Sequence, residues 1–170
     1  MNQEVRKKMK GNDGTGNIPE RDTWETPQAL WDELNKQYKF TFDCCADKKN
    51  TKCKSYCTNF AGLVIGCFTI YDKDEKCWMN PPFSKAYDMF EHFFKVVTKG
   101  VAIYRCDNME TAIWQDVILK GADWVFIPKG RISYEGKVGK GSRFPSALIG
   151  KGVPVPNLTN GIILEVRKRR

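Results

Sequence analysis

The stretch "CWMNPPFSKAY", residues 77–87, ends an apolar run with an uncharged amide, two consecutive prolines and an aromatic ring. Proline fixes φ and lacks an N–H, so the Asn80 to Pro82 segment forms a stiff turn whose carbonyls keep fixed directions. Ser84 then offers an N-cap for a helix that we expect to run to about Val97 and to be closed by Gly100. The stretch therefore predicts a buried strand, a rigid turn and a helix in direct succession.

Alternating strands and helices are also indicated upstream of this stretch. Thr26 as N-cap and Pro27 at the first helical position open a helix whose apolar residues recur at helical spacing. The alternating strand "KFTFDCCA" follows this helix and leads into Asp43. Asp43 and Asn80 thus both follow a strand, and polar groups at the carboxyl ends of strands are the pattern of a ligand crevice in an α/β sheet.

The downstream half continues the alternation. Strands are expected at "VAIYR", "DWVFIP" and "GIILEV", and a helix from Asn108 to Leu119. Residues 131–150 are expected to form a strand, a Gly/Lys-rich loop and another strand. The pattern predicts an α/β domain with a mostly parallel sheet and helices on both faces. We expect one domain over residues 22–166, a flexible basic arm at 1–21 and a basic tail at 167–170.

The charge distribution favours a polyanionic partner. Lys and Arg number 28 against 20 Asp and Glu, giving a net charge of +8, and the basic residues gather at both ends and across residues 129–143. Clustered cations bind nucleic acid through counterion release, although solvated surface lysines would look the same. No apolar run approaches the ~20 residues of a membrane span, and the N-terminus lacks the apolar core of a secretion signal. We expect a cytoplasmic protein that does not bind membranes.

The cysteines are expected to be reduced thiols. Their number, seven, is odd, and no secretion signal accompanies them. Zinc is the alternative for the cluster Cys44, Cys45, Cys53 and Cys57, but the chain has no CxxC pair and its single histidine, His92, lies in an apolar helical run. We therefore expect no metal site.

The rigid turn after the central strand suits a planar amine. The Asn80 side-chain oxygen and the Pro81 carbonyl can accept the two hydrogens of an exocyclic amine such as adenine N6 and orient its lone pair. Phe83 can stack on a base that is flipped out of its duplex. A neutral amide suits methyl transfer to such an amine, since the proton leaves only after attack on a cationic sulfonium and no strong base is needed first.

A series of stretches in order along residues 22–150 resembles the phage DNA N6-adenine methyltransferase (Dam) family. The stretches that carry the resemblance are "DTWETP" at 22–27, "FTFDCCA" at 40–46, Asn50, "YCTNFAGL" at 56–63, "CWMNPPFS" at 77–84, "YRCDNMETAIW" at 104–114, "GRI" at 130–132 and "RFPSALI" at 143–149. The resemblance implies a Rossmann-like, site-specific adenine methyltransferase that uses S-adenosylmethionine, acts on double-stranded DNA, and is phage- or prophage-encoded in a bacterial host. The sequence does not determine the oligomeric state, and we expect a monomer.

The resemblance also implies roles for individual residues. The NPPF element, Asn80, Pro81, Pro82 and Phe83, would be catalytic. Cofactor contacts would come from Trp24, Thr26, Pro27, Asp43, Cys45, Ala46 and Asn59. The usual glycine-rich turn is absent, and Cys44, Cys45 and Ala46 stand in its place. Independently of the resemblance, the basic segment suggests DNA contacts from Lys129, Arg131, Lys137, Lys140 and Arg143.

Other functions remain open at this point. An NPP-aromatic element also supports methylation of cytosine N4, of a protein glutamine or of RNA. A basic DNA-binding module with a vestigial site is a further alternative, and it would bind no cofactor.

Overall fold

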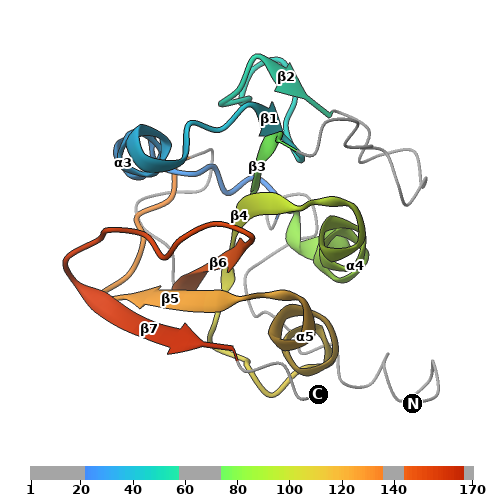
Figure 1. The fold of residues 1–170 in the computed structure, drawn as a ribbon, viewed down its shortest axis with the longest axis vertical. Helices are drawn as coiled ribbons and strands as arrows, with labels where there is room; N and C mark the ends of the chain where they lie inside the picture. Colours follow the sequence, from blue (N-terminus) through green and yellow to red (C-terminus); the bar gives the residue numbers. More distant parts are fainter. Residues whose placement is uncertain (1–21, 58–73, 136–143, 167–170) are drawn as a thin grey trace.

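A computed structural model of the chain describes residues 22–57, 74–135 and 144–166. The expected arm and tail, together with Asn59, Lys137, Lys140 and Arg143, lie outside these segments. The elements, in chain order (Figure 1), are α3 (Gln28–Tyr38), β1 (Phe42–Asp43), β2 (Ser55–Tyr56), β3 (Lys76–Met79), the 3-10 helix η1 (Phe83–Lys85), α4 (Ala86–Val96), β4 (Lys99–Arg105), the π-helix η2 (Ile113–Ile118), α5 (Leu119–Gly121), β5 (Trp124–Pro128), β6 (Ser146–Lys151) and β7 (Gly161–Glu165).

The described strands form one mixed sheet in the order β2-β1-β3-β4-β6-β5-β7. The pairs β1–β2, β1–β3 and β3–β4 are parallel, whereas β6 is antiparallel to both β4 and β5, and β7 is antiparallel to β5. Because β4 and β5 both oppose β6, they point the same way. The α/β class is confirmed, and the predicted parallel character is confirmed only in part, since β6 separates β4 from β5.

Helices cover both faces of the sheet, α3 on one side and α4 and α5 on the other (Figure 1). Successive side chains of β4 alternate between two apolar clusters, as the period of a strand requires. Val101 and Ile103 pack in the cluster that contains Trp31 and Leu34 of α3. Ala102 and Tyr104 pack in the cluster of α4 and η2. Trp31, Trp78 and Trp114 are all buried.

The start of α3 differs from the sequence expectation. Pro27 precedes the helix as its N-cap residue, and no side chain at this position makes a capping hydrogen bond, so the predicted Thr26 cap is wrong. The carboxylate of Glu135 instead accepts the Gln28 N–H at 3.0 Å. Glu25 and Glu135 also exchange two backbone hydrogen bonds of 2.9 Å. A contact between residues far apart in the chain therefore replaces the local cap.

Four further local predictions are wrong. Ser84 lies within η1, α4 begins at Ala86, and Gly100 belongs to β4 rather than ending the helix. The segment after Asn108 begins with a turn in which Thr111 Oγ1 donates to the Asn108 carbonyl at 2.8 Å, and η2 starts only at Ile113. The strand expected from residue 131 is reduced, in the described part, to an isolated bridge at Glu135.

Candidate active site

Asp43 and Asn80 lie at the same edge of the sheet. The parallel pairing sets Asp43, the last residue of β1, opposite Trp78 of β3, and Asn80 follows β3 directly. Both residues line one pocket of about 590 Å³. Its lining residues are Asp22, Thr23, Trp24, Glu25, Thr26, Asp43, Cys45, Asp47, Lys49, Asn50, Lys52, Trp78, Asn80, Pro82, Ser84 and Lys85. The crevice predicted at the carboxyl ends of the strands is present.

The amide of Asn80 is oriented by the backbone of Trp24. Asn80 Nδ2 donates to the Trp24 carbonyl at 2.8 Å. With the nitrogen bound to the protein, the amide presents Oδ1 as its hydrogen-bond acceptor. Pro82, with φ −58° and ψ 135°, continues the turn in an extended conformation. No hydrogen bond from the described residues reaches the carbonyl of the buried Pro81.

A second contact joins the same two segments. The carboxylate of Asp22 accepts two hydrogen bonds from Ser84. Ser84 N donates to Oδ1 at 3.0 Å, and Ser84 Oγ donates to Oδ2 at 2.5 Å. A charged carboxylate acceptor makes both of these hydrogen bonds stronger than a neutral acceptor would. Residues 22–24 are thus attached to the NPPF turn at both of its ends, through Asn80 and through Ser84.

Asp43 is a buried carboxyl at the base of the pocket. Only 3 % of the residue is exposed. Its Oδ1 accepts the N–H of Cys45 and its Oδ2 accepts the N–H of Lys52, each at 3.2 Å. Burial raises the pKa of Asp43 from the ordinary 3.8 to about 6, and the two N–H groups and the charge of Lys52 offset part of that rise. The carboxyl therefore fixes the turn after β1 and faces the pocket.

Two buried polar atoms in the pocket lining lack a hydrogen-bond partner among the described residues. They are the hydroxyl of Thr26, a residue that is 3 % exposed, and the indole Nε1 of Trp24. A buried donor without a hydrogen-bond partner lowers the stability of the fold by about 1–3 kcal/mol. Such atoms are therefore candidates for hydrogen bonds to a bound ligand. Thr26 is thus better suited to a bound molecule than to the helix cap predicted for it.

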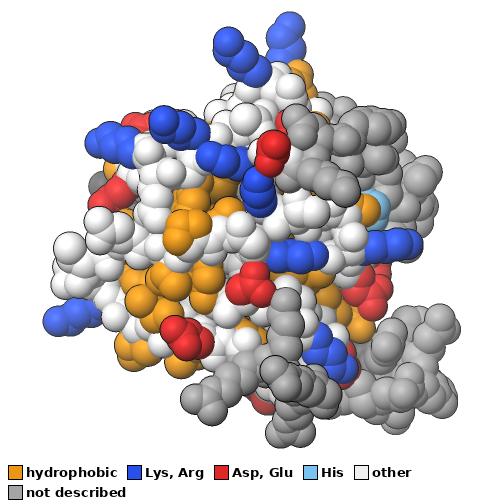
Figure 2. Space-filling view, in the orientation of Figure 1, with side chains coloured by type: hydrophobic (Ala, Val, Ile, Leu, Met, Phe, Trp, Pro, Cys, Tyr) orange, Lys and Arg blue, Asp and Glu red, His pale blue; other side chains and the backbone are white. Residues whose placement is uncertain are grey.

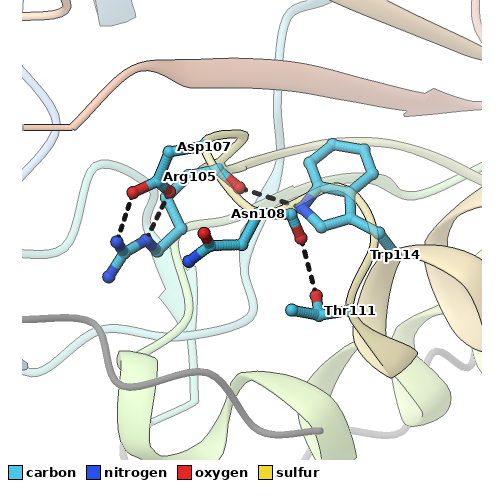
Figure 3. A network of polar contacts seen from close by, with 5 residues as sticks. All are labelled: Arg105, Asp107, Asn108, Thr111 and Trp114. Carbon is cyan, nitrogen blue, oxygen red and sulfur yellow. Dashed lines mark hydrogen bonds and ion pairs between the residues drawn. The ribbon is translucent and has the colours of Figure 1, made fainter.

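Phe83 lies in an aromatic cluster beside the pocket. Its ring makes edge-to-face contacts with Tyr104 and Phe144, with centroids 5.8 and 5.1 Å apart. The buried guanidinium of Arg105 lies 5.7 Å from the centre of the Phe83 ring and 5.2 Å from that of Phe144. Figure 3 shows this guanidinium turned to the carboxylate of Asp107, which accepts from Nε at 2.7 Å. Phe83 is therefore held by packing and by a charged group.

Several of the predicted site residues converge on the pocket. Trp24, Thr26, Asp43, Cys45, Asn80 and Pro82 line it. Pro27, Ala46, Pro81 and Phe83 are adjacent in the chain to lining residues but are not part of the lining. Of the predicted DNA-binding residues, Lys129 and Arg131 are exposed and lie outside the pocket.

The structure adds lining residues that the sequence interpretation assigned no role. They are Asp22, Thr23 and Glu25 ahead of α3, Lys85 after the NPPF turn, and Asp47, Lys49 and Lys52 in the segment between β1 and β2; Ser84, predicted only as a helix cap, and Asn50, which only carried the resemblance, also line the pocket. Their signal in the sequence is weak, because that segment has no apolar periodicity and Asp22 is 62 residues away from Ser84.

Within the described segments, no three His, Cys, Asp or Glu side chains are grouped so as to hold a metal ion. None of the helices in these segments combines the length and the apolar character of a membrane span. The six cysteines described, Cys44, Cys45, Cys53, Cys57, Cys77 and Cys106, are thiols rather than disulfides.

An α/β domain with a polar pocket at the carboxyl ends of its strands, bordered by a rigid Asn-Pro-Pro-Phe turn, has the layout of an enzyme that binds its ligand at the sheet edge. The sequence pattern of the DNA N-6-adenine-methyltransferase (Dam) family matches residues 14–148, and the chain belongs to this family. The DNA N-6-adenine-methyltransferase of Haemophilus phage HP1 (strain HP1c1) is 25 % identical over 120 residues, which cover 68 % of this chain and 67 % of that protein. The family predicted from the series of stretches is confirmed.

Proposed function

We propose that this protein transfers a methyl group from S-adenosylmethionine to the N6 amine of adenine in DNA, at a specific site. The observation that carries the proposal is the orientation of Asn80, whose Nδ2 is bound to the Trp24 carbonyl at 2.8 Å. The opposite orientation would present a donor, which an amine that must itself donate two hydrogens cannot use.

Asn80 and Pro81 hold the amine in this proposal. Asn80 Oδ1 accepts one N6 hydrogen and the Pro81 carbonyl accepts the other, so the nitrogen lone pair turns toward the methyl group. Because both acceptors belong to one stiff turn, they are placed before the substrate arrives. Phe83 is assigned to stacking on the flipped adenine. One face of its ring lies under Arg105, and the opposite face is the one proposed to take the base.

The pocket residues fit S-adenosylmethionine. The unpaired hydroxyl of Thr26 and the indole N–H of Trp24 supply polar groups, Asp43 a buried carboxyl, and Cys45 a small side chain that leaves space. When bound, the cofactor supplies an electrophilic methyl group on a sulfonium, so that the C–S bond breaks as the C–N bond forms and S-adenosylhomocysteine and a proton are released. Pro27 and Ala46 are proposed to support these contacts from behind the lining.

The basic segment 129–143 is proposed to contact the DNA, with Lys129 and Arg131 as its exposed described members. The relative from a bacteriophage supports a phage or prophage origin and activity in the cytoplasm of a bacterial host. A single chain supplies every residue named in the proposal, which is consistent with action as a monomer.

Labelled methyl transfer to unmethylated plasmid DNA, followed by identification of the modified nucleoside, tests the proposal. Wild type should yield N6-methyladenine, and Asn80→Ala should abolish transfer. Asn157→Ala, which removes an exposed asparagine amide outside the pocket, is the matched control and should retain full activity. N4-methylcytosine as the product would contradict the choice of adenine. Label taken up only by protein or RNA would contradict DNA as the substrate, and failure of the wild type to bind the cofactor would indicate a vestigial site.

A further inference from the structure

Two exposed lysines stand at the pocket and have no role in the chemistry described above. Lys49 belongs to the segment between β1 and β2, and Lys85 follows the NPPF turn, so they reach the pocket from different parts of the chain. Both belong to the pocket lining and yet are exposed, which places them at its mouth. Lys52, the third lysine of the lining, is half-buried, and its Nζ donates to Gln28 Oε1 at 2.8 Å.

The acidic side chains of the lining leave these two lysines without an ion pair. The ion pairs of the described segments join Lys99 to Asp74, Arg105 to Asp107 and Lys120 to Asp116. The lining contains four acids. Asp22 accepts hydrogen bonds from Ser84, Asp43 and Asp47 accept backbone N–H groups of their own segment, and Glu25 is bound through its backbone to Glu135 and, within the described segments, forms no ion pair with either lysine. Lys49 and Lys85 therefore present their charge to solvent at the pocket mouth.

The geometry of a flipped nucleotide indicates which group would lie next to Lys49 and Lys85. A base that enters the pocket stays attached to its deoxyribose, so the phosphates on its two sides must lie at the mouth. Cations at the mouth can neutralise those phosphates and release counterions. Lys48 and Lys54, also exposed, extend the same segment. Figure 2 shows Lys and Arg side chains gathered over α3, β1 and β2, in the upper part of the view.

We propose that Lys49 and Lys85 form a phosphate-binding rim that grips the DNA backbone on either side of the nucleotide whose base enters the pocket. The inference rests on the proposed function for its substrate. It adds a contact surface separate from the basic segment 129–143.

The test is the salt dependence of binding between the full chain and a fluorescent duplex oligonucleotide. The slope of log Kd against log salt should fall by about 1 for Lys49→Gln or Lys85→Gln, and by about 2 for the double variant. Lys95→Gln is the matched control, because this substitution also removes one positive charge. Lys95 is exposed in the last turn of α4 and lies outside the pocket. The slope of this variant should equal that of the wild type. Circular dichroism checks that each variant is folded.

Three outcomes would overturn the rim. One is a slope in the double variant equal to that of Lys95→Gln. Another is weaker S-adenosylmethionine binding in the double variant with an unchanged DNA slope, which would assign the lysines to the cofactor. The last is no DNA binding by the wild type. Methyl transfer separates the two proposals: a wild type that methylates no DNA while the slope still falls contradicts the proposed function and leaves the rim standing.

Discussion

The guanidinium of Arg105 lies 5.7 Å from the centre of the Phe83 ring, so a charged side chain buried at the end of β4 fixes the aromatic residue of the NPPF turn. Arg105 is itself fixed by Asp107 at Nε and Nη2 and, through its backbone carbonyl, by the indole N–H of Trp114 at 3.0 Å. The position of Phe83 thus depends on residues that reach no ligand.

Arg105→Lys should lower the free energy of unfolding by about 1–3 kcal/mol, because lysine keeps the charge but loses the two-point contact with Asp107 and the planar contact with the ring. Denaturant unfolding measures the change. Arg131→Lys, at an exposed arginine, should leave stability within about 0.5 kcal/mol of wild type. Equal stability of the two variants would show that the buried arginine fixes nothing.

Asp22→Ala should lower kcat for methyl transfer roughly tenfold, because it removes both charge-assisted hydrogen bonds that hold residues 22–24 against the NPPF turn, whereas Ser84→Ala, which loses the hydroxyl but keeps the backbone N–H bond to Asp22, should lower kcat by less. KM for the cofactor should change little. The double variant should lose no more than Asp22→Ala alone, since that change already removes both hydrogen bonds. Glu33→Ala, at an exposed acid of α3, is the control. Additive losses would contradict a shared contact.

Thr26→Val should leave the stability of the free protein unchanged or higher, because valine keeps the shape and removes a buried hydroxyl that has no partner in the described residues. The same variant should bind S-adenosylmethionine about 2–10-fold more weakly, the value of one hydrogen bond. Calorimetric titration and thermal unfolding give the two numbers. A loss of stability with unchanged cofactor affinity would mean that the hydroxyl serves the fold alone.

The free energy of unfolding should depend on pH through the raised pKa of the Asp43 carboxyl. Its folded pKa of about 6 exceeds the ordinary 3.8, so the folded state binds the proton more tightly. The stability that protonation supplies is present below about pH 4 and is lost as pH rises through 6. A shift of about 2 units corresponds to about 3 kcal/mol. Asp43→Asn cannot titrate there, so wild type should lose about that amount relative to the variant between pH 4 and 7. Parallel stability curves would contradict the raised pKa.

Local patterns in the sequence were sufficient for the elements that carry the site. The helical spacing of Trp31 and Leu34 predicts α3, and the apolar run before Asn80 predicts β3. Both patterns are local, because each is formed by residues that are close together in the chain. The strand-end position of Asp43 and Asn80 followed from the same patterns, and the pocket forms where they meet.

Contacts between distant segments could not be predicted in this way. Glu135 caps α3 from 107 residues away, so the Ser/Thr capping rule selected Thr26 wrongly. Ser84 was predicted as a cap for the same reason, but its hydroxyl is committed to Asp22. The insertion of β6 between β4 and β5 depends on pairing energy across the whole sheet, which no local period encodes.

That insertion also sets an order for assembly of the chain. β4, which ends at Arg105, pairs with β3 on one edge, but its other edge has no partner until Ser146–Lys151 is made, and β5, which ends at Pro128, pairs only with β6 and β7, both later in the chain. During synthesis, the half of the sheet that holds Asp43 and Asn80 can pair early, while β5 waits with its edges unprotected. A chain truncated before residue 146 would therefore leave β4 and β5 with unpaired strand edges, and exposed strand edges favour aggregation.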